Sequence, residues 1–77
     1  MTFSWMNEGN IGAAADRVHV CRVNDRKIGR LHYYEGVGYF AYLLDERLNR
    51  SPIKSLMEAM ALVHNSYRQR VEHRLSA

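Results

Sequence analysis

The segment RVHVCRVNDRKIGRLHYYEGVGYFAYLL, residues 17–44, contains the strand and turn patterns that indicate a β-sheet. In residues 17–23 and 27–34, β-branched and aromatic side chains alternate with polar ones, a pattern typical of half-buried strands. Asn24-Asp25-Arg26 between them favours a turn, and a second turn with two glycines leads into the apolar run 39–44. The segment therefore predicts a three-stranded antiparallel β-meander over residues 17–44.

A long helix is predicted after the meander, over residues 51–75. Ser55 and Glu58 have the spacing of a capping box, and Ser51-Pro52 offers an alternative start one turn earlier. Apolar residues then recur every three or four positions, at Leu56, Met60, Val63, Tyr67 and Val71. We expect this stripe to pack on the sheet, which makes the chain a single small α+β domain over residues 1–77.

Residues 1–16 precede the meander and follow neither the strand period nor the helix period, although Phe3, Trp5, Met6 and Ile11 are apolar. We therefore predict an irregular or short-helical N-terminal segment, with Asn10 capping a short helix over residues 11–15. The apolar side chains of this segment are one candidate to cover the sheet face that the long helix leaves free.

The positions of the two turns predict which side chains face the helix. If the turns centre on Asp25-Arg26 and Gly36-Val37, the strand alternation places seven residues in a core beneath the helix: Val18, Val20, Leu31, Tyr33, Phe40, Tyr42 and Leu44. The opposite face then receives a mixture of residues: His19, Cys21, Val23, Ile28, Arg30, His32, Tyr34, Tyr39, Ala41 and Leu43. A solvated face is mainly polar, so we expect this one to be covered by residues 1–16, by a partner or by a second copy of the chain.

Size and composition exclude several classes of protein. A 77-residue chain buries too little surface to hold separate substrate and cofactor domains. Its longest apolar stretch falls far short of the roughly 20 residues that span a bilayer. A single cysteine, Cys21, forms no internal disulfide, which favours the reducing cytoplasm. The net charge of +3 suits nucleic-acid binding and ordinary solubility equally. We expect no membrane partner, no cofactor and no enzymatic activity.

The histidines give one candidate metal site. On the predicted register His19 lies opposite His32, with Cys21 two residues along, and imidazole and thiolate both bind zinc. A structural zinc site needs four ligands, and the sequence has no paired cysteine or histidine motif that would supply the others. We therefore predict that these residues hold no metal.

Tyrosine and arginine, which are enriched at interface hot spots, supply the candidate partner-binding residues. On the predicted register, Tyr34 and Tyr39 point outward as a cross-strand pair beside Arg30. Cationic residues in the last turns of the helix stabilise its dipole, and they are also placed to contact acidic groups or phosphates. The candidate contact residues are therefore Arg30, Tyr34, Tyr39, Arg68, Arg70 and Arg74.

Three stretches carry a resemblance to a known group of proteins: Gly29-Arg30-Leu31, Gly38-Tyr39-Phe40-Ala41-Tyr42 and Ser55-Leu56-Met57-Glu58-Ala59. Together they resemble the strand-strand-strand-helix layout of short proteins of phages and mobile elements, among them anti-CRISPR inhibitors. The resemblance covers residues 17–75. It implies a non-enzymatic protein in the cytoplasm of a bacterial host, which occludes a site on a larger bacterial protein or nucleoprotein complex. Many such inhibitors are acidic DNA mimics, whereas this chain is basic.

The sequence leaves three hypotheses open. The first is a small inhibitor that sterically occludes a site on a protein partner. The second is a nucleic-acid-binding module that uses the basic helix end and the outward tyrosines. The third is a homodimer joined through the first strand edge or the outer sheet face.

Overall fold

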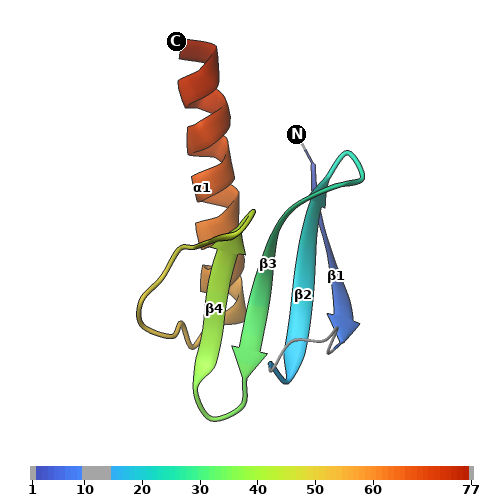
Figure 1. Cartoon of the computed structure of the whole chain (residues 1–77), viewed down its shortest axis with the longest axis vertical. Coiled ribbons are helices and arrows are strands. Elements are labelled where there is room, and N and C mark those ends of the chain that lie inside the picture. Colours follow the sequence, from blue (N-terminus) through green and yellow to red (C-terminus); the bar gives the residue numbers. More distant parts are fainter. Residues whose placement is uncertain (1, 10–14, 77) are drawn as a thin grey trace.

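The computed structural model describes residues 2–9 and 15–76, and the side chains of residues 2–9 and 15–71. One antiparallel sheet has its strands in sequence order and is followed by one long helix (Figure 1). The elements are β1 (Phe3–Gly9), β2 (Arg17–Val23), β3 (Arg26–Tyr34), β4 (Gly38–Leu43), β5 (Glu46–Arg47) and α1 (Leu56–Ser76). The predicted α+β class is confirmed. The count of three strands is wrong, because β1 and β5 extend the meander at its two edges.

The first hairpin turn explains one error in the predicted register. Asn24 and Asp25 have φ angles of 52° and 63°, and Val23 pairs with Arg26, so the turn centres on Asn24-Asp25. Asn and Asp tolerate positive φ, which suits a tight two-residue hairpin turn. A bulge then leaves Ile28 without an opposite residue on β2. Beyond this bulge, β2 is displaced by one position from the predicted pairing, so its side chains point to the opposite face.

The second hairpin turn shifts β4 in the same way. Tyr34 pairs with Gly38, so this turn centres on Gly36, whose φ is 78°. Leu31 consequently lies opposite Ala41, whereas the predicted register placed it opposite Tyr42. A displacement of one residue reverses the direction of every side chain in a strand.

The predicted core beneath the helix is therefore correct only in part. The register places Leu31 and Tyr33 on the α1 side, as predicted. Leu44 lies in the turn after β4 and is 55% exposed, so its prediction as a core residue is wrong. Four other predicted core residues point away from α1: Val18, Val20, Phe40 and Tyr42. Their places in the core are taken by residues that the prediction assigned to the outer face: Cys21, Val23, Ile28, Ala41 and Leu43.

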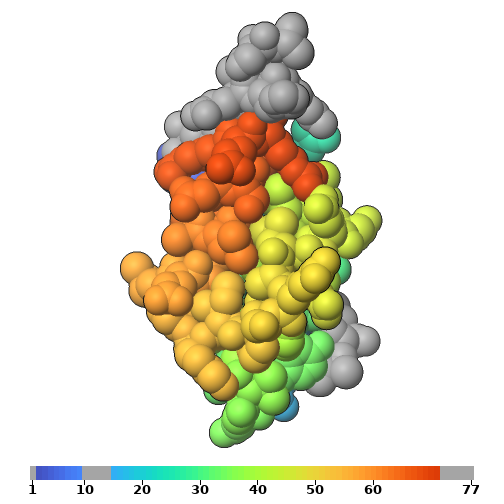
Figure 2. Space-filling view, turned by 90° about the vertical axis from the view of Figure 1, so that its left-hand side faces the viewer, coloured from blue at the N-terminus to red at the C-terminus, as the bar shows by residue number. Residues whose placement is uncertain are grey.

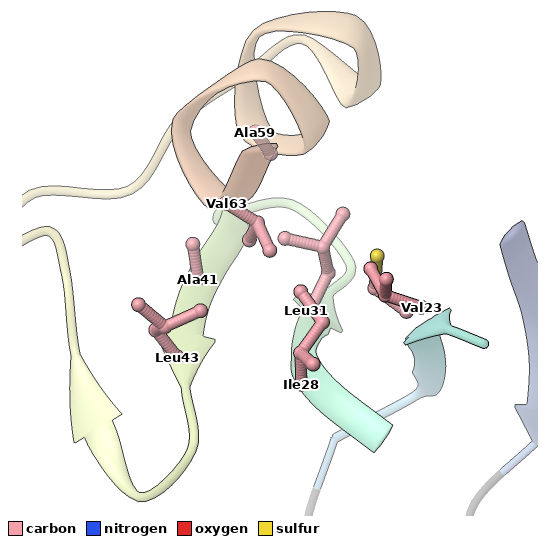
Figure 3. Close-up of a cluster of buried hydrophobic side chains, with 8 residues drawn as sticks. Val23, Ile28, Leu31, Ala41, Leu43, Ala59 and Val63 are labelled. Atoms are coloured by element: carbon pink, nitrogen blue, oxygen red, sulfur yellow. The ribbon is translucent and has the colours of Figure 1, made fainter. Parts of the chain in front are cut away.

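The core lies between α1 and the facing side of the sheet (Figure 3). Leu31 and Val63 are fully buried, and Ala59 of α1 points into the same cluster. The predicted helix stripe is thus confirmed at Val63, and three further members pack partly buried against the cluster: Leu56, Met60 and Tyr67. Gly29 permits the close approach of α1, since a Cβ at this position would lie 2.9 Å from Val63 Cγ1. Burying one leucine contributes about 1.5 to 3 kcal/mol to stability.

The connector between β5 and α1 lies beside the helix in Figure 2 and is hydrogen-bonded to β4. Ile53 exchanges two backbone hydrogen bonds of 2.7 and 3.0 Å with Tyr39. The Asn49 side chain accepts a hydrogen bond from the Ala41 N–H at 2.7 Å and donates one to the Tyr39 carbonyl at 3.1 Å. These bonds fix the edge of β4 and the point at which α1 begins.

The helix starts at the later of the two predicted positions. α1 begins at Leu56, and the Ser55 hydroxyl oxygen accepts a hydrogen bond from the Glu58 N–H at 3.3 Å. This bond is half of the predicted capping box. The alternative start at Ser51-Pro52 is wrong, because these residues belong to the connector.

The N-terminal residues form an edge strand, and the prediction of an irregular segment is wrong for residues 3–9. Trp5 lies opposite Cys21 on β2, and its Nε1 donates a hydrogen bond of 2.8 Å to Nε2 of His64 on α1. The Phe3 ring stacks on the same imidazole, with the ring centroids 4.1 Å apart. Both aromatic side chains therefore lie on the α1 side of the sheet. The predicted cap at Asn10 and all but the last residue of the helix after it lie outside the described residues.

Candidate functional site

The sheet face that points away from α1 carries a group of aromatic and basic side chains on β3, β4 and β5. Alternate positions of these strands share this face, because successive side chains of a strand point to opposite sides. We call this surface the aromatic–basic face, and it consists of Arg30, His32, Tyr34, Phe40, Tyr42 and Arg47. Arg47 is exposed, and the other five are half-buried.

The rings of this face form two contacts between β3 and β4. Tyr34 meets Phe40 edge to face, with the ring centroids 5.8 Å apart. His32 and Tyr42 lie closer, with a centroid distance of 4.7 Å. Aromatic contacts of this kind stabilise a sheet by about 0.5 to 1.5 kcal/mol beyond the area they bury. The rings are therefore held in fixed positions before any partner arrives.

Two arginines lie over these rings. The Arg30 guanidinium carbon is 4.6 Å from the centroid of Tyr42, and that of Arg47 is 5.6 Å from the centroid of Phe40. A guanidinium over an aromatic ring is attracted by the negative ring face and keeps its N–H groups directed outward in the guanidinium plane. Each stack thus presents an apolar surface and a cation together.

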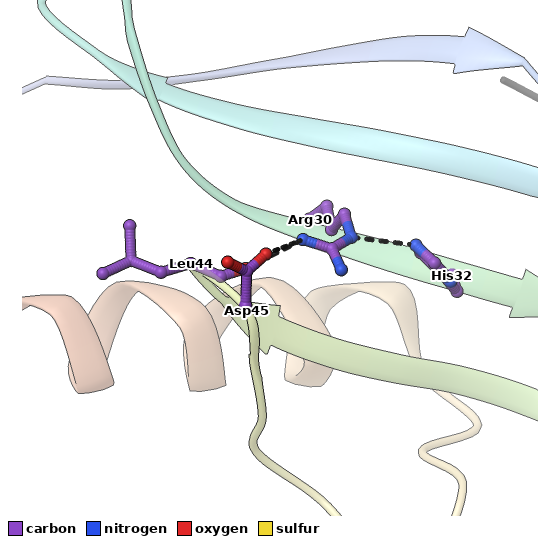
Figure 4. Close-up of polar contacts among 4 residues, drawn as sticks. All are labelled: Arg30, His32, Leu44 and Asp45. Carbon is purple, nitrogen blue, oxygen red and sulfur yellow. Dashed lines mark hydrogen bonds and ion pairs between the residues drawn. The ribbon is translucent and has the colours of Figure 1, made fainter. Parts of the chain in front are cut away.

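Arg30 is held by further contacts, shown in Figure 4. Its Nε donates a hydrogen bond of 3.1 Å to Nε2 of His32, and its Nη1 donates one of 2.8 Å to the carbonyl of Leu44. The carboxylate of Asp45 lies 3.9 Å from Nη1 and is fully exposed, so this ion pair contributes little. Arginine has five N–H groups, and these two hydrogen bonds use two of them. The remaining donors suit a carboxylate or a phosphate.

His32 supports Arg30 as a neutral imidazole. Burial, and then the positive charge of Arg30, hold the pKa of His32 below its ordinary value of 6.5. A neutral Nε2 accepts the hydrogen bond from Arg30, whereas a protonated one would repel it. The cation of this pair is therefore Arg30 alone at neutral pH.

On the same side of the sheet, the apolar side chains of β2 are buried. Ala15, Val18 and Val20 form a second small cluster of buried residues, and Tyr34 packs against it. Arg22, also on β2, forms an ion pair of 2.9 Å with Glu8 of β1. Half-buried rings and stacked arginines are thus concentrated on β3, β4 and β5.

The structure brings only two of the predicted contact residues together on this face, Arg30 and Tyr34. The predicted outward pair of Tyr34 with Tyr39 is wrong, because Tyr34 lies opposite Gly38 and Tyr39 lies opposite Tyr33. The Tyr39 ring is on the α1 side, 4.8 Å from the ring centroid of Tyr33, and packs against the main core.

The predicted contact residues on α1 lie apart from the aromatic–basic face. Arg68 stacks over the Phe3 ring at 5.3 Å, and Arg70 forms an ion pair with Glu46 of β5. The side chain of Arg74 lies outside the described residues, although its backbone belongs to α1. The predicted contact residues therefore lie on two separate surfaces.

Sequence reasoning missed four members of the aromatic–basic face: His32, Phe40, Tyr42 and Arg47. Phe40 and Tyr42 were assigned to the core by the displaced register. His32 was assigned to the correct face but was not among the predicted contact residues. The alternation of residues 38–43 would have found the rings if the second turn had been centred on Gly36.

The three side chains considered for a metal site do not converge. His19 lies opposite Leu31, and His32 lies opposite Val18, so the two imidazoles are on different faces of the sheet and their predicted pairing is wrong. Cys21 is buried, and burial raises the pKa of its thiol to about 11, which keeps it protonated at neutral pH. Among the described residues, no three His, Cys, Asp or Glu side chains are grouped for a metal ion.

In comparisons with known proteins, no family model, no curated protein and no solved structure matches this chain. No helix in residues 2–9 and 15–76 combines the length and the apolar character that crossing a bilayer requires. The function is therefore inferred from the surface chemistry described above.

Proposed function

We propose that this chain is a small non-enzymatic binding protein whose aromatic–basic face docks on a protein partner and covers a site there. The observation that carries the proposal is the pair of arginine–aromatic stacks, Arg30 on Tyr42 and Arg47 on Phe40. Tyrosine and arginine are enriched among the residues that carry most of the energy of protein interfaces. Side chains already fixed by stacking lose less entropy on binding than free ones.

The expected partner is a larger bacterial protein or nucleoprotein complex with an acidic patch. Arg30 retains unused N–H donors, and carboxylate oxygens can accept hydrogen bonds from them. An inhibitor from a phage or mobile element, as the sequence resemblance over residues 17–75 implies, is the specific form of this proposal. A chain of this size acts most simply by steric occlusion of the partner site.

The test is partner capture from a bacterial lysate, with the full chain immobilised and with variants of both surfaces. Tyr42→Ala with Arg47→Ala removes one ring and one cation from the aromatic–basic face. Met57→Ala with Arg50→Ala is the matched control, because Met57 is 75% exposed on α1 and Arg50 is exposed in the connector. A hot-spot side chain is worth about 2 kcal/mol or more, which is about a 30-fold loss of affinity.

We expect the wild type and the control variant to retain a nuclease-insensitive partner that the face variant loses. Circular dichroism of both variants, with thermal melting, shows whether the fold is kept. Retention of the same partner by the folded face variant would refute the proposal. Tyr42→Phe, which keeps the ring under Arg30, is expected to retain the partner as well.

Single-stranded nucleic acid is the second candidate partner. Aromatic rings beside arginines on a sheet provide stacking surfaces for bases and cations for phosphates. If two phosphates are contacted, affinity for a fluorescent oligothymidine falls about sevenfold between about 50 and 200 mM salt. This result, together with loss of oligothymidine binding in the face variant, would favour nucleic acid over a protein partner.

A further inference from the structure

A pocket lies where the start of β3, the β4–β5 turn and the second half of α1 meet. Its volume is about 160 Å³, and an apolar cavity of about 150 Å³ admits a molecule the size of benzene. The apolar part of its lining is formed by five residues, Ile28, Leu43, Leu44, Tyr67 and Val71, of which the first two are buried core residues. A pocket of this size and lining suits a branched or aromatic side chain.

Three cations line the same pocket: Arg26 and Lys27 at the start of β3, and Arg70 on α1. Arg70 forms an ion pair with Glu46. Within residues 2–9 and 15–71, neither Arg26 nor Lys27 has an acidic partner, and both are exposed. Positive charge is thus in excess beside an apolar wall. A complementary ligand combines carboxylates with an apolar group.

Leu44 adds an independent indication that this site is used. It lines the pocket, it is 55% exposed, and its φ is 56°. Positive φ in a tight hairpin turn favours Gly, Asn or Asp, and it strains leucine. An exposed apolar side chain kept at such a position points to a functional contact. Because the Leu44 carbonyl also holds Arg30, this residue connects the pocket with the aromatic–basic face.

We infer that this pocket binds an apolar side chain of a partner protein whose neighbouring residues are acidic. The inference rests on the proposed function and deepens it, because it specifies the chemistry of the partner. The apolar side chain packs on Leu44 and Tyr67, and the flanking carboxylates lie beside Arg26 and Lys27. Burial of the apolar group provides affinity, while the cations speed association and select an acidic partner.

The test uses a fluorescein-labelled peptide in which a leucine and a phenylalanine are flanked by glutamates, titrated with the full chain and followed by fluorescence anisotropy. Leu44→Gly removes one wall of the pocket and relieves the backbone strain, so the fold is expected to be retained. Arg26→Glu with Lys27→Glu reverses the charge of the rim. We expect each variant to bind the peptide about tenfold more weakly than the wild type, which corresponds to a loss of about 1.4 kcal/mol.

Matched controls separate pocket effects from general charge effects. Arg50→Glu changes an exposed cation outside the pocket, and Met57→Ala removes an exposed apolar side chain outside it. Both are expected to bind the peptide within about twofold of the wild type. A second peptide, with glycine and serine in place of leucine and phenylalanine, is expected to bind about tenfold more weakly because it has no group to bury.

Two results of the peptide titration would by themselves overturn the inference. One is absence of measurable binding of the acidic apolar peptide to the wild type. The other is equal binding by the wild type and both pocket variants. Decanoate serves as a competitor, because a small amphipathic anion is the alternative occupant. Displacement of the peptide by decanoate at lower concentration than by unlabelled peptide would also overturn it.

The face variant Tyr42→Ala with Arg47→Ala distinguishes failure of this inference from failure of the proposed function. If the face variant loses the lysate partner and the pocket variants keep it, the proposed function stands and the pocket inference fails. If the pocket variants lose the partner and the face variant keeps it, the aromatic–basic face is refuted as the docking surface. Loss of the partner in the face variant and in the pocket variants supports both the proposed function and the pocket inference.

Discussion

The two faces of the sheet differ in what covers their side chains. On one face, Leu31 and Cys21 are closed off from water beneath Val63 of α1. On the aromatic–basic face, Tyr42 and Phe40 are half-buried beneath the guanidinium groups of two arginines. The first arrangement removes apolar area from water completely, whereas the second leaves rings and cations available for contact. We therefore expect the α1 side of the sheet to contribute more to stability than the aromatic–basic face.

A cavity in the core on the α1 side is expected to cost the most stability. Leu31→Ala empties a fully buried position between β3 and α1 and is expected to lower the free energy of unfolding by about 2 to 5 kcal/mol. Small domains are stable by only about 5 to 15 kcal/mol, so this change removes much of the total. Urea unfolding followed by circular dichroism measures it. The exposed Met57→Ala is the control, and a loss for Leu31→Ala as small as the control's would contradict this placement of the core.

The next effect tests the other face. Tyr42→Ala removes the ring under Arg30 and its contact with His32, and we expect it to cost about 1 to 2 kcal/mol of stability. The same urea experiment measures this change beside Leu31→Ala. A cost equal to that of Leu31→Ala would show that this face is a second core, and the two faces would not differ in their contribution to stability.

The strands and the helix were predictable because their signals are local. The alternation of residues 17–23 predicted β2 correctly, and the Ser55 cap with Val63 on the apolar stripe predicted α1 and its buried side. Which face of the sheet meets α1 was not predictable from alternation, because both faces of β2 are apolar. Val18 and Val20 on one side look the same as Val23 and Cys21 on the other.

The prediction of the candidate site depended on the positions of the two hairpin turns, because an error of one residue in a turn reverses the face of every side chain in the paired strand. Gly36 and Gly38 both have positive φ, and the sequence alone does not show which pair of residues closes the hairpin. The bulge at Ile28 is set by burial of that side chain in the core and leaves no local signal. β1 was missed because Met6 is 59% exposed and interrupts the alternation of Phe3 and Trp5.

A change of pH is expected to alter stability by a smaller amount through both faces, because each face holds a histidine that accepts a hydrogen bond. His64 accepts from Trp5 on the α1 side, and His32 accepts from Arg30 on the other. Burial, and then a neighbouring arginine, lower the pKa of both imidazoles below 6.5, with Arg68 as the neighbour of His64. The unfolded chain therefore binds protons more readily than the folded one. Stability is complete above about pH 6.5 and falls as the pH drops below that value.

Urea unfolding between about pH 7.5 and 5.5 measures this decline before most carboxylates titrate. His64→Gln keeps an acceptor oxygen for Trp5 and cannot be protonated, so its stability is expected to fall less steeply than that of the wild type. His32→Gln makes the matched change on the aromatic–basic face and is expected to reduce the slope in the same way. A wild-type stability that is constant or rises toward pH 5.5 would contradict the lowered pKa values. If only His64→Gln reduces the slope, the imidazole of His32 is open to water, and the aromatic–basic face is less closely packed than its ring contacts indicate.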